Sequence, residues 1–396
     1  MTGPTDISVP AAVLEILGRL EDAGFETWCV GGAIRDALLG NLQQDVDLAT
    51  AASPEQVRGL FRRTIPVGVE HGTVGVLDEV GGLHEVTTFR RDVQTDGRHA
   101  VVEFGVSLDD DLARRDFTVN AIAYHPLRHD WRDPFDGRSD LARRLIRCVG
   151  DPAARFREDR LRILRGLRFA ARFDFEIDAD TWEAAQAQAT DISHLSAERV
   201  REEWIKGIDT AQSLGRLIRL WLDSGVASVW LPECVPSPGH DATNDPADPG
   251  SRDPVLVTAF YCAPSAPAWR RLKGSAAEIR RAEAIDRGPP RPPTDDPREV
   301  RRWMALTGAA ADDLRILALW RGEAAAGWPA AMDAVRARGE ATARSGLAVT
   351  GDDLVAAGIP RGPAVGHALT RLLDAVLDDP ARNTRDALLA IARDSA

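Results

Sequence analysis

The sequence predicts an α+β fold in which a mixed N-terminal part, with both strands and helices, precedes a longer helical part. Three observations predict this fold. Short apolar runs alternate with helix-like segments and glycine turns over residues 1–140. From residue 141 onward, apolar residues recur mainly at helical spacing. The chain has 396 residues, which is enough for about two to four domains.

The N-terminal elements can be placed from apolar spacing, caps and glycine turns. Ser53, Pro54 and Gln56 form a helix-start pattern, with Ser53 as the cap. The expected elements in chain order are a helix over 9–23, a strand over 28–30, a helix over 33–39, a strand from Asp45, a helix from Ser53, and a hairpin of strands 73–77 and 83–89 around Gly81-Gly82.

The stretch from Glu26 to Thr50 carries the strongest chemical pattern. Gly31 and Gly32 separate a strand from a helix, and such glycines let backbone N–H groups approach a phosphate. Arg35, in the first turn of that helix, could reach the same anion. Asp45 and Asp47 are two apart on the next strand, so their side chains leave the same face. Adjacent carboxylates on one face suit Mg²⁺, which bridges carboxylates and substrate phosphates.

Each part of this pattern alone has a simpler interpretation. A Gly-Gly pair is typical of a turn, and two aspartates near a strand end are typical of solvated loop charges. Their combination in one short window favours a site for phosphoryl or nucleotidyl transfer.

The same stretch, G-G-A-I-R-D-A-L-L-G-N-L-Q-Q-D-V-D-L-A-T, resembles the signature of the tRNA nucleotidyltransferase and poly(A) polymerase family. This is the class II branch of the polymerase-beta-like nucleotidyltransferases. The resemblance implies a polymerase-beta-like head with Asp45 and Asp47 as ligands of the catalytic metals. It also implies that Gly32 and Arg35 contact the incoming nucleotide.

Glu85 lies on the second strand of the expected hairpin and shares a face with Thr87. From the pattern alone, an edge-strand charge and a metal ligand are equally good interpretations. The resemblance favours a third metal ligand, because E-V-T-T-F-R falls where the family's fold places its third acidic residue. His71, in the similar segment V-G-V-E-H-G-T, is expected to be structural.

Residues 91–100 are polar and rich in turn formers, which predicts a mobile loop beside the site. In CCA-adding members of the family, a flexible loop here is associated with the switch from adding C to adding A. The resemblance therefore disfavours a member that stops after two cytidines.

The segment R-R-D-F-T-V-N-A resembles the family's second motif, which holds the ribose and triphosphate. Arg115 could pair with phosphate, and Asp116 could accept a hydrogen bond from a sugar hydroxyl. The alternative for Arg115 is an ion pair with Asp111, four residues earlier on a helix. Asn120 is expected to fix nearby backbone.

Ten arginines and three acidic residues occupy residues 141–172, where Asp151-Pro152 starts an expected continuous helix. Asp159 and Arg162 are three apart on it, which alone favours an intrahelical ion pair. The alternative is base recognition, because an accepting carboxylate and a donating guanidinium match the edges of C and A but not of U and G.

E-D-R-L-R resembles the family's E-D-x-x-R motif, whose aspartate and arginine act as a protein template for the base. Arg165 and Arg168 match further family arginines near the nucleotide. Arg160 stands where proline is common, a small departure. S-H-L-S-A-E-R-V-R-E-E-W resembles the last family motif, and Glu198 and Arg199 are expected to brace the base-reading helix.

Composition restricts the binding partners and the cellular compartment that we expect for the protein. The formal net charge of −12 argues against a surface that is basic throughout, although RNA binding needs only a local basic patch. The four cysteines are far apart and fit neither a disulfide framework nor a zinc site. No signal pattern or membrane-length apolar run is present, so we expect a reduced, cytoplasmic protein without membrane contact.

The second half is less informative: helical patterns are interrupted by turn-rich stretches at 236–254 and 288–297. His240-Asp241 lacks the further histidines that a phosphohydrolase metal site needs. By resemblance this half would hold tRNA by its shape and backbone. The expected domains are a head over 1–140, a neck that recognises the base over 141–207, a body over 208–290 and a tRNA-binding tail over 291–396.

The leading prediction is template-independent addition of C, C and A to the 3′ end of tRNA from CTP and ATP, with two Mg²⁺ ions. The alternatives are a poly(A) polymerase, an enzyme that adds only A or only CC, and a non-catalytic RNA-binding protein on the same scaffold. A small-molecule nucleotidyltransferase is disfavoured by the long helical half and by Asp159 and Arg162.

Overall fold

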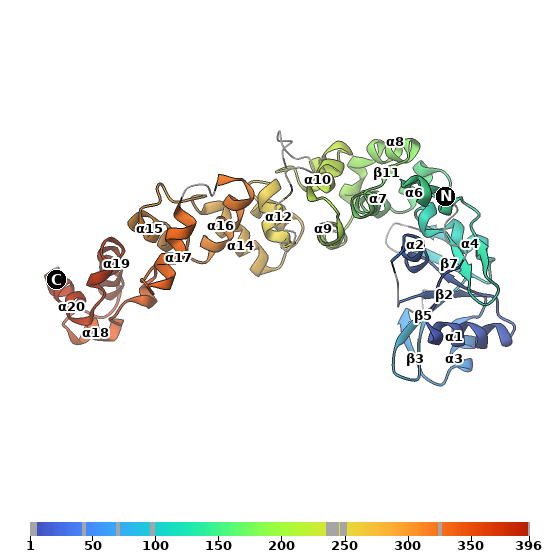
Figure 1. Ribbon diagram of the computed structural model, residues 1–396, viewed down its shortest axis with the longest axis horizontal. Coiled ribbons are helices and arrows are strands. Elements are labelled where there is room, and N and C mark those ends of the chain that lie inside the picture. The colour runs from blue at the N-terminus through green and yellow to red at the C-terminus, as the bar shows by residue number, and fades with distance from the viewer. Residues whose placement is uncertain are drawn as a thin grey trace. The chain divides into compact units, whose positions relative to one another are not determined.

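The computed structural model describes residues 6–41, 45–68, 72–95, 100–234, 245, 252–323 and 327–394. The chain divides into two compact units, each described here by itself (Figure 1). The first comprises Met1–Leu231 with Pro236–Thr243, and the second comprises Pro232–Val235 with Asn244–Ala396. The predictions for His71 and for the His240-Asp241 pair concern residues that lie outside the described part of the chain.

A seven-stranded mixed sheet forms the centre of the first unit, with strand order β3-β4-β5-β2-β1-β8-β9. Strands β2 and β5 pair in parallel, and the other neighbours pair antiparallel. The strands are β1 (Thr27–Val30), β2 (Asp47–Thr50), β3 (Thr64–Gly68), β4 (Thr73–Leu77), β5 (Leu83–Thr88), β8 (Ala123–His125) and β9 (Asp130–Arg132).

Three helices pack near this sheet: α1 (Ala11–Asp22), α2 (Gly32–Leu38) and α3 (Pro54–Leu60). Helix α1 buries the predicted apolar stripe of Val13, Ile16, Leu17 and Leu20. Ser53 and Gln56 form the predicted reciprocal cap at the start of α3. The elements expected from the N-terminal pattern are therefore present, and β4 and β5 form the expected hairpin.

Residues 91–100 differ from the prediction of a loop. Strand β6 (Arg90–Thr95) pairs antiparallel with β7 (Ala100–Phe104) in a separate two-stranded sheet. The prediction was wrong because a pair of strands outside the main sheet needs no regular apolar alternation, and the polar composition masked it. Residues 96–99, between the strands, lie outside the described residues.

The rest of the first unit is mainly helical. A continuous helix from Pro152 to Phe173 was expected, but the chain leaves helical geometry at Asp159, which has φ −147° and ψ 106°. The side chain of Asp159 accepts a 3.0 Å hydrogen bond from the backbone N–H of Leu161, the first residue of the next helix, and this local bond favours the turn between the two helices. The helices are α4 (Leu108–Ala113), η2 (Thr118–Asn120), α5 (Gly137–Arg143), α6 (Pro152–Glu158), α7 (Leu161–Phe173), α8 (Ala179–Ala187), η3 (Ala189–His194), α9 (Ala197–Thr210), α10 (Leu214–Asp223) and α11 (Ala227–Trp230), with a short parallel pair of β10 (Leu145–Ile146) and β11 (Glu176–Ile177).

The regular elements described in the second unit are helices, as predicted for the C-terminal half. Residues 288–296 connect two of them without regular structure, at the turn-rich stretch read from the sequence. The helices are α12 (Pro254–Tyr261), α13 (Ala266–Arg271), α14 (Ala276–Arg287), α15 (Pro297–Thr307), η5 (Gly308–Ala310), α16 (Ala311–Trp320), α17 (Trp328–Ala337), η7 (Arg344–Gly346), α18 (Gly351–Ala356), α19 (Pro363–Asp378), η8 (Pro380–Arg382) and α20 (Arg385–Arg393). The predicted fold class is confirmed, and the four-domain division stays a prediction.

The cysteine prediction was wrong for one pair. Cys234 and Cys262 form a disulfide in the second unit, whereas Cys29 and Cys148 are free and buried. The two bonded cysteines are 28 positions apart, so their pairing depends on the tertiary fold rather than on a spacing motif. Among the helices of the described residues, none combines the length and the apolar character that crossing a bilayer requires.

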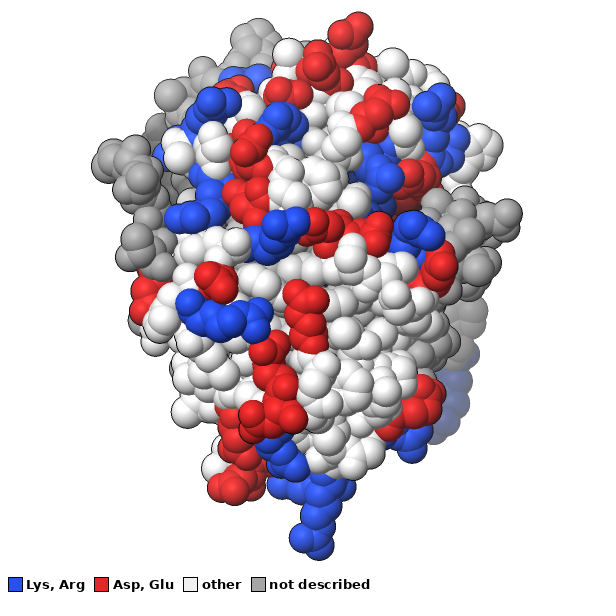
Figure 2. Space-filling view, turned by 90° about the vertical axis from the view of Figure 1, so that its right-hand side faces the viewer, with Lys and Arg blue, Asp and Glu red and all other residues white. Residues whose placement is uncertain are grey.

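Charged side chains of both signs are intermixed on the face of the molecule in Figure 2. This agrees with a chain that carries 49 basic and 61 acidic residues. A strongly basic site must therefore be a local feature.

Candidate active site

A cleft of about 470 Å³ in the first unit gathers most of the residues predicted for the site. Seven arginines and three aspartates line it, which gives the lining a formal charge of +4 in a chain of net charge −12. Such a lining attracts a polyanion of the size of a triphosphate. The lining residues are Gly31, Gly32, Arg35, Asp47, Arg114, Arg115, Asp116, Asn120, Asp159, Arg162, Arg165, Arg168, Phe169 and Arg172.

The Gly31-Gly32 turn forms one wall, where β1 ends and α2 begins. Gly31 has a φ of +81°, which disfavours any residue with a side chain. A β-carbon there would lie 3.2 Å from Nη1 of Arg115 and 3.8 Å from Oδ2 of Asp47. The absent side chain therefore keeps open the space between a guanidinium and a carboxylate.

The carboxylates of the predicted metal site lie on and beside the sheet. Strand β2 begins at Asp47, not at Asp45 as expected; Asp45 precedes the strand, is exposed and does not line the cleft. Leu48 pairs with Val86, so the parallel register brings Glu85 of β5 alongside Asp47. Glu85 is half-buried and also lies outside the lining.

Asp47 has an unusual pKa. Asp47 is exposed, but partial desolvation of its carboxylate in the cleft and the neighbouring carboxylates of Glu85 and Asp45 raise its pKa to about 6, and the charge of Arg115 opposes the rise. The three carboxylates are thus close enough to repel one another. Within the described part of the chain, however, no three Asp, Glu, His or Cys side chains form a complete metal-binding group. Any metal here would need further ligands from its substrate.

Arg115 makes the ion pair that was its simpler interpretation, since its Nη2 lies 3.1 Å from Oδ2 of Asp111. Its Nη1 donates to the backbone oxygen of Asn120 across 3.3 Å. Its Nε is buried and has no hydrogen-bond partner among the described residues. The guanidinium is therefore held in place at the cleft by two contacts, and these use two of its five N–H groups.

Asn120 joins two predicted site residues and does more than brace backbone. Its Nδ2 donates to Oδ1 of Asp116 across 2.8 Å, and its Oδ1 accepts from Nη1 of Arg35. Arg35 is only 4% exposed and lies over the rings of Phe169 and Phe173. Arg35 is consequently fixed by protein contacts, and it lines the cleft as a preorganised charge.

Asp116 is buried and bonds to helix α7. Its Oδ2 accepts from Nε of Arg165 across 2.8 Å. Burial raises the pKa of Asp116, but Arg165 and Asn120 outweigh it and hold that pKa below 3.8. Arg168, the next arginine on the same face, donates to Glu203 of α9 across 2.7 Å. These bonds tie α7 to its neighbours on both sides.

Asp159 and Arg162 both line the cleft but do not pair with each other in the way an uninterrupted helix would allow. Oδ2 of Asp159 accepts from Nη2 of Arg199 across 2.9 Å, which is the bracing contact expected of Arg199. Arg162 donates to Glu158 across 2.8 Å and to the backbone oxygens of Arg155 and Arg114. The break at Asp159 thus leaves one acceptor and one donor group side by side on the cleft wall.

Comparison with known proteins identifies the family of this chain. The sequence profile of the "Poly A polymerase head domain" matches residues 27–147, and the profile of the "Probable RNA and SrmB- binding site of polymerase A" matches residues 174–236. The CCA-adding enzyme of Limosilactobacillus fermentum is 33% identical over 397 residues, which cover 95% of each chain. The chain belongs to the CCA-adding enzyme family.

Other members of this family match more closely over a shorter span. The CCA-adding enzyme of Leuconostoc mesenteroides is 47% identical over 211 residues, which are 52% of this chain and 52% of that enzyme. The matched region thus spans about half the length of such relatives. The crystal structure of the Bacillus stearothermophilus CCA-adding enzyme in complex with CTP is 31% identical, with a TM-score of 0.73 over 97% of this chain and 96% of that chain.

Sequence reasoning missed three residues that line the cleft of this family member, Arg114, Phe169 and Arg172, and it gave Asn120 only a backbone role. One signal was available for Arg172, which lies four positions after Arg168 and so on the same helical face. Arg114 directly precedes Arg115, but adjacency on a chain does not predict a shared cleft. The ring of Phe169 lies beneath the guanidinium groups of Arg35, Arg165 and Arg168.

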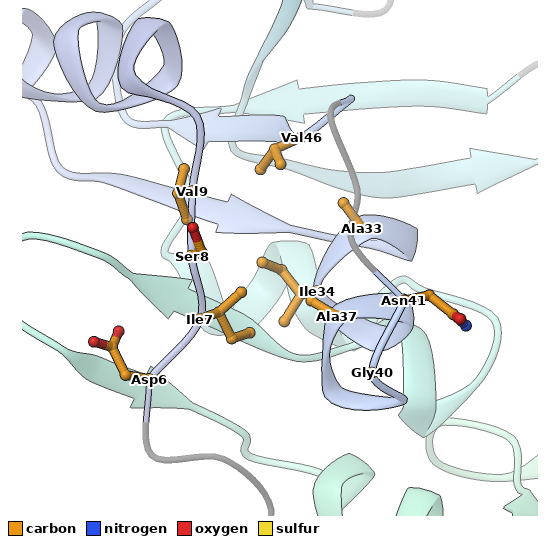
Figure 3. Close-up of a pocket in the computed structure, with 10 residues that line it drawn as sticks. All are labelled: Asp6, Ile7, Ser8, Val9, Ala33, Ile34, Ala37, Gly40, Asn41 and Val46. Atoms are coloured by element: carbon orange, nitrogen blue, oxygen red, sulfur yellow. The ribbon is translucent and has the colours of Figure 1, made fainter.

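A second cavity, of about 260 Å³, lies between helix α2 and the N-terminal segment of residues 6–9 (Figure 3). Its lining is largely apolar, with Ile7, Val9 and Ile34 among the side chains drawn there. Asp6 is the charged residue of this lining. The arginine-rich cleft, and not this cavity, therefore has the chemistry to bind a nucleotide.

Proposed function

We propose that this protein adds C, C and A to the 3′ end of tRNA, using CTP and ATP and releasing pyrophosphate. The observation that carries the proposal is a single basic cleft that contains Asp47, the Gly31-Gly32 turn, and both Asp159 and Arg162. Phosphate binding, metal binding and base selection would then occur at one site. The full-length relative and the CTP-bound neighbour support this reaction.

The arginines of the cleft would bind the triphosphate. Guanidinium groups match phosphate oxygens in pairs, and they keep their charge at all physiological pH values. Arg115 lines the cleft, and each of its two terminal nitrogens keeps one N–H for such an oxygen beyond the bonds to Asn120 and Asp111. Arg35, Arg165 and Arg168 would contribute mainly through charge, because protein acceptors already hold them.

Asp45, Asp47 and Glu85 would hold divalent metal, and we propose Mg²⁺. These carboxylates suit a metal because the pKa of Asp47 is raised, and a bound cation would stabilise the charged form of its carboxylate. Mg²⁺ is commonly held by one or two carboxylates and by substrate phosphates, so a partial protein shell suits it. When bound, Mg²⁺ would supply activation of the tRNA 3′-hydroxyl and charge for the leaving pyrophosphate.

Asp159 and Arg162 would choose the base. A carboxylate offers about four lone-pair sites, and two hydrogen bonds to Asp159 leave capacity to accept from the amino group of C or A. Arg162 has five N–H groups, of which three take part in the bonds described above. A remaining N–H could donate to the ring nitrogen of the same base, whereas U and G present the opposite pattern. The carboxylate of Asp116 would accept a hydrogen bond from a hydroxyl of the ribose.

The helical second half would bind tRNA by shape and backbone, and the expected neck, body and tail remain part of this proposal. We also propose a cytoplasmic location, where mature tRNA is used. Poly(A) polymerase activity and partial addition of A or CC are the alternatives, because the matched head profile is shared with poly(A) polymerases.

One assay separates these activities. The protein is incubated with Mg²⁺ and tRNA lacking its 3′ CCA, with each labelled NTP alone and with CTP and ATP together, and the products are sequenced. We expect CC with CTP alone and CCA with both. Long A tracts would indicate a poly(A) polymerase, termination after CC or addition of A only to a CC end would indicate a partial enzyme, and binding without incorporation would indicate an RNA-binding protein.

A further inference from the structure

Helices α2 and α7 are connected along two separate paths of polar and charged side chains. The first connection is the path from Arg35 through Asn120 and Asp116 to Arg165, described above. The second is made by Asp36 of α2 and Arg172 of α7. Together the two connections close a ring between the helix that begins at the Gly31-Gly32 turn and the helix that carries Arg162.

The second connection centres on Asp36. Its Oδ2 accepts a 2.8 Å hydrogen bond from Nη2 of Arg172, which is 136 residues later in the chain. Its Oδ1 accepts a 2.7 Å bond from Nε of Arg35. Asp36 is 5% exposed and does not line the cleft, whereas Arg172 does.

Asp36 separates two positive charges that would otherwise repel each other. Burial lowers the pKa of Arg35, the carboxylate of Asp36 raises it, and the charge of Arg172 lowers it further. Both guanidinium groups also lie over the ring of Phe173, at 4.7 and 4.8 Å from its centre. Without the carboxylate, these two like charges would share one aromatic surface with no counter-ion between them.

Arg35 transmits this arrangement to the phosphate-binding turn. A β-carbon at Gly32 would lie 3.3 Å from Nη2 of Arg35, so the guanidinium packs directly against the turn. A shift of Arg35 would therefore shift the support of the Gly31-Gly32 backbone. At the other helix, a shift of α7 would displace Arg162 and Arg165.

We propose that Asp36 and Arg172 are positioning residues for nucleotide addition, which lock the phosphate-binding turn to the base-reading helix. This inference rests on the proposed function. It adds a role for Asp36, a position of the signature stretch to which no role is assigned above, and a positioning role for Arg172. Neither residue needs to touch the reacting atoms, because a displacement of about 1 Å at a site can lower a rate by roughly 100-fold.

Arg172 lines the cleft, so direct contact with a phosphate is the rival explanation. A double-mutant cycle with Asp36→Asn, Arg172→Gln and the double variant separates the two. If the two residues position the site together, each single change lowers kcat/KM for addition of the first CTP about 10-fold. The kcat/KM of the double variant is then no lower than that of the less active single variant. The loss should fall mainly on kcat, with tRNA affinity unchanged. Arg172→Lys, which keeps the charge, should recover part of the rate.

Arg132→Gln is the matched control. Arg132 pairs with Asp109 across 2.6 Å in the same unit, but both are exposed and neither lines the cleft. This change should leave kcat and KM at wild-type values. Thermal unfolding of every variant, with assays run well below each Tm, separates positioning from loss of folded protein. If Asp36→Asn does not fold, Asp36→Glu takes its place in the cycle.

Three results would overturn the inference. In the first, Arg172→Gln lowers kcat/KM and Asp36→Asn does not. In the second, the kcat/KM losses of the two single variants multiply in the double variant. Either result would favour direct contact of Arg172 with a phosphate. Variants with a lowered Tm but unchanged kcat/KM would show a purely structural pair. A wild-type protein that adds no nucleotide would instead refute the proposed function, so the two failures are distinguishable.

Discussion

Asp159, at the break between helices α6 and α7, accepts a 2.9 Å hydrogen bond from Nη2 of Arg199 in helix α9. The partner of the proposed base-reading carboxylate is thus 40 residues away and not on its own helix. This bond orients the carboxylate while leaving lone pairs for a base.

Replacing Asp159 by Ala should relax the choice among nucleotides or cripple addition. A paired contact to a base edge is worth about 1–3 kcal/mol of discrimination, so the preference for CTP over UTP should fall roughly 10- to 100-fold. Arg199→Ala should give a smaller loss in the same direction, because the carboxylate stays but loses its orientation. Single-turnover incorporation with each NTP measures both. Arg157→Ala, an exposed change on α6, is the control; unchanged rejection of UTP and GTP by Asp159→Ala would contradict base reading.

Replacing Asp47 by Ala should abolish incorporation while leaving tRNA binding largely intact. Loss of metal-derived charge stabilisation of several kcal/mol predicts a fall in kcat of at least about 1000-fold. Added Mg²⁺ should raise the Tm of the wild type in the presence of CTP but not that of the variant. Asp130→Ala, an exposed aspartate on β9, should behave as wild type. Strong residual activity in Asp47→Ala would refute the metal assignment.

How far the sequence predicts this site depends on whether each contact is local. Glycines at a strand end, caps such as Ser53 and arginines spaced along α7 are local signals, and the structure brings those residues to the expected elements. The partners of Asp159, Asp36 and Cys234 are 40, 136 and 28 positions away, so no helical or strand period could indicate them. The break at Asp159 was missed although its cause is local, because the apolar spacing on both sides is compatible with one helix.

The buried pair of Asp116 and Arg165 should make stability depend on pH. The pKa of Asp116 is held below 3.8 in the folded protein, so its charge stabilises the fold fully above about pH 4, and this contribution is lost as the pH falls through the lowered pKa. Asp116→Asn should therefore cost about 2 kcal/mol at pH 7, and the difference from wild type should shrink below pH 4. Urea unfolding at several pH values measures this. Asp109→Asn, which breaks an exposed pair, is the control, and a pH-independent difference would contradict the ionised pair.

Salt should weaken tRNA binding although the chain is acidic overall. Cations released from phosphates make the logarithm of the affinity fall linearly with the logarithm of the salt concentration, so the affinity should drop at least about 10-fold between roughly 50 and 200 mM salt. The net charge of −12 implies that these contacts are confined to local groups of arginines, and a modest slope is expected. Asp47→Ala, which removes a carboxylate without adding a phosphate contact, should keep the slope of the wild type. A flat response would mean that tRNA is held by contacts other than phosphate, and the basic cleft would then act on the nucleotide alone.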